Sequence, residues 1–456
     1  MPRARDPVHE VAGAVAALDA SALSEAARDA VRRLVLDSLA VGFAGAACED
    51  GRIVGELVEE WGGRTQATVL GRPARVPSEA AALANGTMIQ ALDYDDTHDP
   101  SAAHTASTVL AAALAAGERC HANGRDVFAA VCAGVEVIAR LGLASEENLG
   151  FTSTSVYGAF GAAAAAARVS RLDAKATRHA LGIVLSQAGG TTQTALDKPL
   201  SKHMQSGFAA QAGVLSATLA QRGVTGVENV FLGRYGFLRL HKRDRFHIDA
   251  LLSPWSEGLH IEALSYKPFP SCRATHAAVQ AALALFAKEP VPAAQIDGVI
   301  VHVPPMSHEL AGRVFEEGTH PLIAAQFSIP YAVACALTRG RLGLEDFTLE
   351  AIRDSAVRAL AARVSVSVTP GEDFTPARVE VYLASGRILS HTVGMLLGSP
   401  GSPMDADAMR RKVDDCLAFA PAGATTLDGA ALASAVDELE ACDDVGEWMS
   451  RIVGHA

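Results

Sequence analysis

Residues 104–143 read HTASTVLAAALAAGERCHANGRDVFAAVCAGVEVIARLGL. Apolar residues recur in this stretch at three- and four-residue spacing, which is the period of one face of an α-helix. Asn123 and Gly124 interrupt the pattern near its middle, and residues of these types commonly separate helices. The stretch therefore predicts two successive helices, at 104–122 and 124–143, whose alanine-rich composition favours close packing.

The same spacing extends over most of the first half of the chain, from about residue 8 to residue 231. Ser24 and Ser78 stand where N-caps are expected, and Gly223 follows a predicted helix end. No identity repeat of 20 to 50 residues accompanies the pattern, so a solenoid is not supported. Helices are predicted at 25–46, 78–92, 104–122, 124–143, 155–170, 173–188 and 204–222.

The character of the sequence changes after about residue 265. Runs of β-branched residues with alternating polarity predict strands, and Ala384-Ser385-Gly386-Arg387 is typical of a hairpin turn. These strands predict a small, mostly antiparallel sheet, and helical periodicity accompanies and follows it. The strands are expected at 299–303, 364–368, 379–383 and 388–393, and the helices at 274–287, 321–338, 347–360, 404–418, 428–439 and 443–452.

Together these patterns predict a mainly α protein in which a smaller α+β domain is inserted near the C-terminus. We expect a large all-helical domain at 1–265 and an α+β lid domain with a mostly antiparallel sheet at 266–397. The breaker-rich segment Gly398-Ser399-Pro400-Gly401-Ser402-Pro403 then leads into helices at 398–456 that rejoin the first domain.

Composition excludes several classes of protein. The 456 residues carry 39 Lys and Arg against 51 Asp and Glu, a net charge of -12, and no basic run of five residues, so nucleic acid is not an expected partner. The seven scattered cysteines form no CxxC pair, which fits a reducing cytoplasm. The N-terminal segment lacks the apolar core of a secretory signal, and Ala159 to Ala167 is too short to span a membrane. We expect a cytoplasmic protein without membrane contact.

The densest polar cluster is Asp93-Tyr94-Asp95-Asp96-Thr97-His98-Asp99, followed by His104. Four carboxylates and two imidazoles within twelve residues are costly to crowd together unless they cap helices, bind a cation or position a substrate. Capping with a solvated loop is the simplest interpretation. Magnesium or manganese would suit the carboxylates, but no second acidic cluster is evident, and we expect no metal.

Two further clusters carry positive charge next to predicted helix starts. Lys198 to His203 precedes the helix at 204–222 and could bind an anion or form a solvated turn. In Lys267 to His276, two prolines hold Lys267, Arg273 and His276 near one another. Cys272 and His276 could pair as a nucleophile and its base, but four-residue spacing is a weak signal. Tyr331 lies in a third motif, Gln326 to Tyr331, where a core role for the phenol is usual.

These motifs, taken in order, resemble signatures of the MmgE/PrpD family, which includes 2-methylcitrate dehydratase, cis-aconitate decarboxylase and iminodisuccinate epimerase. The resemblance extends through nearly the whole chain, including Met404-Asp405 and the helix around Cys416. The residues that carry it are Asn85-Gly86 through Leu92 to Thr97, the Lys202 loop with Gly207 and Ala209-Ala210, Lys267 to His276, and Gln326 to Tyr331.

The resemblance implies an all-helical domain with an α+β lid, a homodimer, no metal or organic cofactor, and an active site between the domains. Residues carried over by motif would have distinct roles. Asp93 and Thr97 would line the site, and His104 would match the histidine after the acidic loop. Lys202, Lys267 and Tyr331 would match the substrate-facing lysines and tyrosine.

One departure from the family pattern concerns proton transfer. Relatives such as the decarboxylase read Gly-Phe-His-Pro-Thr where this chain reads Gly150-Phe151-Thr152-Ser153-Thr154, so Thr152 replaces a histidine. A Thr hydroxyl does not exchange protons near pH 7 as an imidazole does. Either His104, Tyr157 or Tyr331 takes over that step, or the chemistry differs.

The expected function is therefore a cofactor-independent lyase of the dehydratase type, acting on a small di- or tricarboxylate through a carbanion next to a carboxylate. Lys202 and Lys267, with Arg273, would bind the carboxylates, and Asp93 or His104 would serve as base or acid. Three alternatives stay open: decarboxylation of an aconitate-like acid, epimerisation of an aminated dicarboxylate, and a silent carboxylate-binding paralogue suggested by Thr152.

Overall fold

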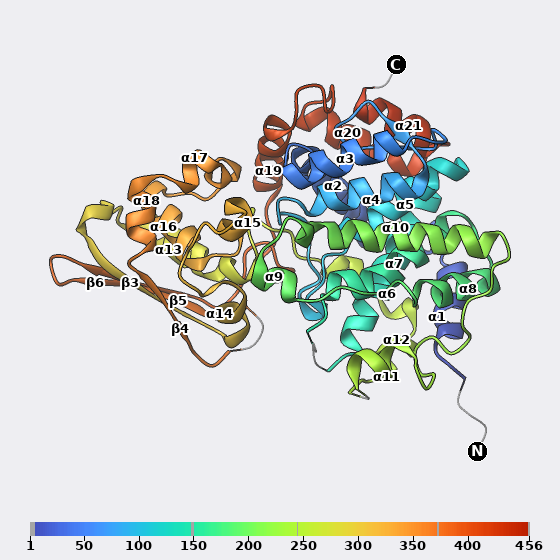
Figure 1. The fold of residues 1–456 in the computed structure, drawn as a ribbon, viewed down its shortest axis with the longest axis horizontal. Helices are drawn as coiled ribbons and strands as arrows, with labels where there is room; N and C mark the ends of the chain where they lie inside the picture. The colour runs from blue at the N-terminus through green and yellow to red at the C-terminus, as the bar shows by residue number, and fades with distance from the viewer. Residues whose placement is uncertain (1–4, 147–149, 244, 372–373, 455–456) are drawn as a thin grey trace.

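The computed structural model describes residues 5–146, 150–243, 245–371 and 374–454. The chain is mainly helical, and its four-stranded sheet lies to one side of a large group of helices (Figure 1). This arrangement confirms the predicted fold class. Among the described residues, no helix combines the length and apolar composition that a membrane span requires.

The large group of helices is built from both ends of the chain, because the last three helices lie beside the first ones (Figure 1). The predicted helices of this part are confirmed to within a few residues. Their bounds are α1 Val8–Ala17, α2 Glu25–Gly45, α3 Glu49–Trp61, α4 Ser78–Gln90, α5 Ala106–Cys120, α6 Gly124–Leu143, α7 Ser153–Val169, α8 Ala174–Val184, α9 Gln193–Asp197, α10 Ser201–Gln221, α11 Phe237–Lys242, α12 Asp249–Leu252, α19 Ala406–Phe419, α20 Gly429–Glu438 and α21 Val445–Val453.

Capping explains where two of these helices begin. The Ser24 hydroxyl accepts a hydrogen bond from the backbone N–H of Ala27 at 3.0 Å, which confirms the predicted N-cap of α2. The prediction for Ser78 is wrong, because Pro77 is the N-cap of α4 and Ser78 is its first helical residue. The Ser78 hydroxyl instead donates to Glu79 at 3.1 Å.

Small residues let the central helices approach closely, as their alanine-rich composition predicts. A Cβ atom added to Gly86 in α4 would lie 3.0 Å from the Cα of Gly207 in α10. Such a distance leaves no room for a side chain. The contact fixes the start of α10, which carries Lys202, against the end of α4, which leads into the acidic loop at residues 93–99.

The α+β part contains a sheet in the order β4-β3-β5-β6, with β3 Ile296–Val303, β4 Val364–Val368, β5 Ala377–Leu383 and β6 Ile388–Val393. β3 pairs with β4 in parallel, whereas β3–β5 and β5–β6 are antiparallel. The sheet is therefore mostly antiparallel, as predicted. Gly386, at φ +83°, makes the expected turn between β5 and β6.

The helices of this part are α13 His276–Lys288, α14 Pro305–Ala311, α15 Pro321–Gln326, α16 Ile329–Arg339, α17 Leu349–Ile352 and α18 Ser355–Ala361. Two predicted helices, at 321–338 and 347–360, are each divided in two. Ser328 caps α16 just after α15 ends, with Pro330 in the first turn of α16. Asp354 likewise caps α18 after α17. The sequence pattern concealed these caps because apolar spacing continues across them.

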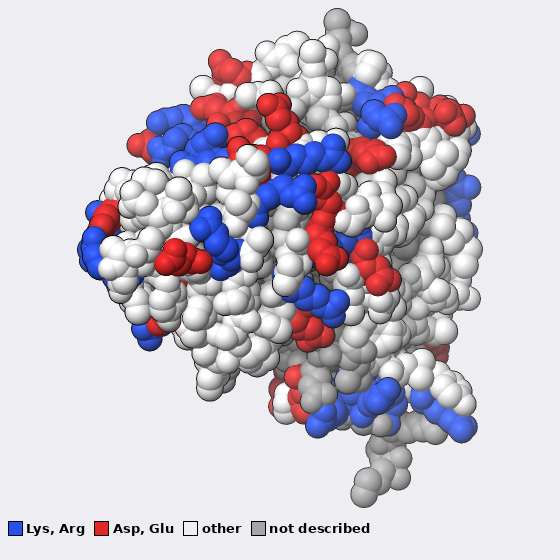
Figure 2. Space-filling model, turned by 60° about the vertical axis from the view of Figure 1, so that its left-hand side comes forward, with Lys and Arg blue, Asp and Glu red and all other residues white. Residues whose placement is uncertain are grey.

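Two hydrophobic cores support a division of the chain. One core joins residues between Val8 and Tyr266 with residues between Met409 and Val453, and also includes Leu344. The other runs from Phe269 to Leu396. We propose that domains divide at the predicted positions, 1–265, 266–397 and 398–456. On the face in Figure 2, acidic and basic side chains are interspersed rather than gathered into one basic patch.

Candidate active site

A cavity of about 670 Å³ lies where residues of both cores meet. Its lining is rich in hydroxyl and amide groups, with cationic and anionic side chains among them. The lining residues are Gln90, Asp93, Thr97, Asp99, Ala102, His104, Gly150, Thr152–Thr154, Thr191–Leu196, Lys202, Gln205, Ser206, Cys272, Arg273, Met306, Glu309, Leu310, Phe327 and Phe374. Such a surface suits a small, polar, charged ligand.

Asp93 stands at the centre of the charged groups. Its Oδ2 lies 2.7 Å from the Lys202 ammonium, and its Oδ1 accepts from the Lys267 ammonium, which also donates to the Asp93 carbonyl at 2.8 Å. Two hydrogen bonds between Thr97 and Ser265, at 2.8 and 2.9 Å, bring the segment before Lys267 to the acidic loop. Lys267 is fully buried, whereas Lys202 borders the cavity.

These two ammonium groups determine the protonation state of Asp93. Burial favours the neutral carboxylic acid, but Lys202 and Lys267 outweigh it and hold the pKa of Asp93 well below its ordinary range. Asp93 is therefore a carboxylate at neutral pH. As a proton acceptor it is weak while both lysines remain in place.

His104 is positioned by a second carboxylate. Its Nδ1 lies 2.9 Å from Asp95 Oδ1, and its Nε2 lies 3.7 Å from Asp93 Oδ1. The backbone N–H of His104 donates to Thr154 Oγ1 at 3.0 Å. A carboxylate at Nδ1 orients an imidazole and leaves Nε2 for proton transfer. Asp95 stands in the acidic loop nine residues before His104, and no signal in the sequence alone indicated this role.

Asp96 and His98 of the acidic loop have structural roles. Asp96 caps α5, accepting from the Thr105 hydroxyl at 2.6 Å and from the Ala106 N–H at 2.9 Å, which confirms the capping interpretation for this residue. Burial and the nearby Asp95 raise the pKa of Asp96 to about 6. His98 stacks on His260 and is not among the described lining residues.

Asp93, Asp95 and His104 are also the described groups that could hold a metal ion, since one ligand atom from each lies within 4.8 Å of the others. Both Asp93 oxygens already accept from ammonium groups. A divalent cation here would meet two positive charges beside its ligands. The geometry thus fits an ion-pair network better than a metal centre.

Arg273 forms a second charged pair on the cavity wall. Its guanidinium lies 3.0 Å from Asp99 Oδ2, while Thr97 donates to Asp99 Oδ1 at 2.6 Å. Burial would raise the pKa of Asp99, but Arg273 and these hydrogen bonds lower it. Arg273, Asp99 and Thr97 all line the cavity.

Thr152 lies at the N-terminus of α7, beside Ser153 and Thr154, and these three residues line the cavity. The first N–H groups of a helix lack partners within the helix and carry partial positive charge. The N-terminal end of α7 therefore adds anion-binding capacity to the cavity wall.

Comparison with known proteins identifies the family of the chain. The family description MmgE/PrpD N-terminal domain matches residues 9–248, and MmgE/PrpD C-terminal domain matches residues 269–428. The chain belongs to the MmgE/PrpD family. The resemblance inferred from the motifs is thereby confirmed.

Three relatives are cis-aconitate decarboxylases. The protein from Mus musculus is 27% identical over 424 residues, covering 88% of this chain and 84% of the relative. The Homo sapiens protein is 27% identical over 399 residues, covering 84% and 81%. The Aspergillus terreus protein is 27% identical over 394 residues, covering 80% of each chain.

Three predicted site residues, Lys267, Tyr331 and His276, are absent from the described cavity lining. Lys267 instead supports Asp93 from the buried side. Tyr331 is fully buried in the second core, where its hydroxyl donates to the Asp346 carbonyl and its ring packs against Phe347. His276 is also buried, with Nε2 3.1 Å from the Ser271 carbonyl oxygen. Burial holds the pKa of His276 well below its ordinary value, so this imidazole is neutral.

Cys272 does line the cavity, but burial raises the pKa of its thiol to about 11. Its proposed partner His276 bonds to a backbone oxygen instead. A protonated thiol is a weak nucleophile, so the geometry does not favour that pairing.

The charged side chains of residues 198–203 do not form one anion site, because each has its own partner. Lys198 donates to the Phe327 carbonyl, and His203 bonds to Asp50.

Proposed function

We propose that this MmgE/PrpD protein is a lyase that acts on a small di- or tricarboxylate through a carbanion next to a carboxylate, and that its reaction is loss of CO2 from an aconitate-like acid. The observation that carries the proposal is the single imidazole, His104, that faces the cavity among the described lining residues. Asp95 orients it, and the Asp93–Lys202 pair lies beside it. The names of the relatives also support decarboxylation.

Binding of the substrate would use charges that the cavity presents. Lys202, Arg273 and the N-terminal end of α7 would bind separate carboxylates, and the surrounding hydroxyl groups would complete their hydrogen bonds. Because the same cations lie close to the bound carboxylates, they would also stabilise negative charge that develops there during the reaction.

The proposed step breaks one C–C bond and forms one C–H bond. The leaving carboxylate departs as CO2, and the electron pair of the broken bond stays on carbon, delocalised toward a neighbouring carboxylate. Protonated His104 then delivers its proton to that carbon. Solvent restores the proton on His104, so one proton is consumed for each CO2 released.

Dehydration, the reaction type expected from the sequence, requires an acid for the departing hydroxyl in addition to a base. Epimerisation requires proton exchange on two faces of one carbon. Among the described lining residues, Asp93 is held ionised and the Cys272 thiol has a raised pKa. A reaction with one proton donor therefore suits the cavity best.

The experiment is proton NMR of the purified protein in deuterated buffer with citrate, 2-methylcitrate, cis-aconitate and iminodisuccinate. We expect cis-aconitate to lose a carboxylate and to gain one solvent deuteron, and the His104→Gln variant to lose this activity. Conversion between citrate-type and aconitate-type acids would instead establish a dehydratase. Binding without any deuterium incorporation would favour the silent paralogue.

We also propose the homodimer that the family resemblance implies, and a cytoplasmic location, which the scattered cysteines support. Analytical ultracentrifugation of the purified chain tests the oligomeric state, and a monomer at micromolar concentration would contradict it.

A further inference from the structure

Lys412, from the C-terminal helix α19, reaches the acidic loop without lining the cavity. Its ammonium donates to the Tyr94 carbonyl at 2.8 Å, lies 2.6 Å from Asp37 Oδ1, and lies 4.1 Å from the centre of the Tyr94 ring. The side chains of Lys412 and Asp37 are 2% and 0% exposed. Three distant segments, α2, the acidic loop and α19, thus meet at one buried charge pair.

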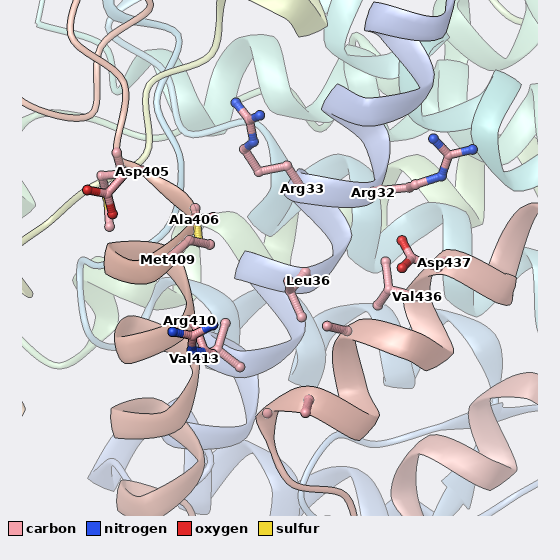
Figure 3. A pocket seen from close by; sticks show the side chains of 14 residues that line it. Arg32, Arg33, Leu36, Asp405, Ala406, Met409, Arg410, Val413, Val436 and Asp437 are labelled. Carbon is pink, nitrogen blue, oxygen red and sulfur yellow. The ribbon is translucent and has the colours of Figure 1, made fainter.

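The packing of α19 on α2 fixes this contact. Figure 3 shows Met409 and Val413 of α19 facing Leu36 of α2 across a pocket of about 390 Å³. Lys412 and Asp37 adjoin these residues in sequence. Met409 and Val413 belong to the first hydrophobic core, and Leu36 packs against it. The ammonium therefore has a defined position relative to the loop.

The loop needs such support because its backbone is strained at Asp93. Asp93 has φ +48°, in the left-handed region that residues with a Cβ rarely adopt. Two successive carbonyl groups there, of Asp93 and Tyr94, each accept from a buried ammonium, Lys267 and Lys412 respectively. The two lysines come from two segments that are distant from the loop in sequence.

We propose that Lys412 and Asp37 are positioning residues, which fix the Tyr94 carbonyl and thereby direct Asp93 toward Lys202 and Asp95 toward His104. Lys412 supplies the hydrogen bond, and Asp37 supplies the negative charge that lets an ammonium remain in a buried place. The kinetic consequence rests on the proposed function, whereas the structural consequence does not.

The test removes both charges together, because Lys412→Met alone would leave Asp37 unpaired in the interior. The variant is Lys412→Met with Asp37→Ala. A matched control is Arg140→Met with Glu136→Ala, another buried pair, joined at 2.8 Å within α6. With cis-aconitate, we expect kcat of the first variant to fall at least tenfold and KM to change less than threefold, while the control keeps kcat within twofold. An unchanged kcat in the folded first variant would overturn the proposal.

A gentler pair, Lys412→Gln with Asp37→Asn, keeps amide donors near the Tyr94 carbonyl. We expect its kcat to lie at least threefold below that of the parent and above that of the Met/Ala variant. If the Met/Ala variant does not fold, the Gln/Asn variant tests the positioning role in its place. A kcat within twofold of the parent would then overturn that role.

A crystal structure of the folded variant tests positioning without any substrate. We expect Asp93 to leave the left-handed region and its contact with Lys202 to open beyond 4 Å. If the parent turns over no acid in the panel, the proposed function fails, but the crystal structure still tests whether Lys412 and Asp37 position the loop. An Asp93 that keeps its backbone conformation and its contact with Lys202 would overturn the proposal.

Discussion

The Lys202 ammonium lies 2.7 Å from Oδ2 of Asp93, so the lysine at the cavity wall is paired before any substrate carboxylate arrives. Lys267 occupies the other carboxylate oxygen. One anion between two cations leaves a net charge of about +1 for the three groups. Asp93 therefore sets how much positive charge the cavity offers to a polycarboxylate.

Replacing Asp93 with Asn should separate binding from turnover. Asn tolerates the left-handed backbone, so the loop can keep its shape while Lys202 and Lys267 lose their counter-charge. We expect citrate or cis-aconitate to bind about tenfold more tightly, roughly 1.4 kcal/mol, and more so at low salt, while turnover falls. Isothermal titration calorimetry at two salt concentrations measures the first effect. Weaker binding by the Asn variant would show that Asp93 itself contacts the ligand favourably.

The two lysines should differ in their effect on stability. Lys267 is fully buried, so Lys267→Ala leaves a buried carboxylate with one partner fewer and should cost about 3–5 kcal/mol. Lys202 has a side chain 13% exposed, and Lys202→Ala should cost about 1 kcal/mol. Urea unfolding measures both. Combining Lys267→Ala with Asp93→Asn should recover part of the loss, and full additivity would argue against the pairing.

The sequence predicted the sheet and most helices because each strand or helix face is a local pattern. The alternation of Val299 to Val303 is visible without its partners, and it corresponds to β3. The division at Ser328 was missed because an N-cap inside a continuous apolar run changes no period. Local sequence patterns thus predicted the presence of helices and strands better than the residues at which they end.

The candidate site was predictable in part, since its charges stand in short motifs. Their mutual arrangement was not, because Lys202 and Lys267 are 109 and 174 residues from Asp93. The family motif implied that Tyr331 faces the substrate, whereas its hydroxyl bonds to a backbone carbonyl in the core, which is the usual place of a buried tyrosine. Ion pairs between residues that are far apart in sequence can be identified only once the three-dimensional structure is known.

Asp95→Asn should impair catalysis with little effect on binding. The amide would no longer hold His104 in the tautomer and orientation that leave Nε2 free, so kcat should fall by about 10²- to 10³-fold with KM nearly unchanged. Steady-state kinetics by CO2 release measures this. Asp96→Asn is the control, because that residue caps α5: it should lower stability by about 1 kcal/mol and leave kcat within threefold. Equal losses of kcat in both variants would contradict a specific role for Asp95.

Glu118 should make stability fall as pH rises. Burial, acting against hydrogen bonds from Thr68, raises the pKa of this carboxyl from 4.5 to about 7. The folded chain then binds a proton more strongly than the unfolded chain, so stability is lost between pH 4.5 and 7, by about 3 kcal/mol for this group. Urea unfolding from pH 5 to 8 should show a slope that Glu118→Gln removes.

Glu59 provides the matched control for that measurement. Its pKa is lowered by the Arg72 guanidinium, so its contribution is already complete above the ordinary pKa of a glutamate and is lost only at lower pH. Glu59→Gln should therefore leave the slope between pH 5 and 8 unchanged. A slope that persists in Glu118→Gln would assign it to another group.

Thr152→His tests whether one missing imidazole restricts the chemistry. The new side chain would stand at the N-terminal end of α7 on the cavity wall, with the helix dipole favouring its neutral form. A neutral imidazole at pH 7 can accept a proton, so deuterium exchange into bound citrate or iminodisuccinate should rise by about 10²-fold or more, without loss of CO2. Thr152→Asn, similar in size to threonine but without a titratable group, should show no such rise. If Thr152→His exchanges deuterium no faster than Thr152→Asn, the missing imidazole does not restrict the chemistry. The restriction then lies in the substrate that the cavity accepts, because the added imidazole has no acidic C–H group of the bound ligand within reach.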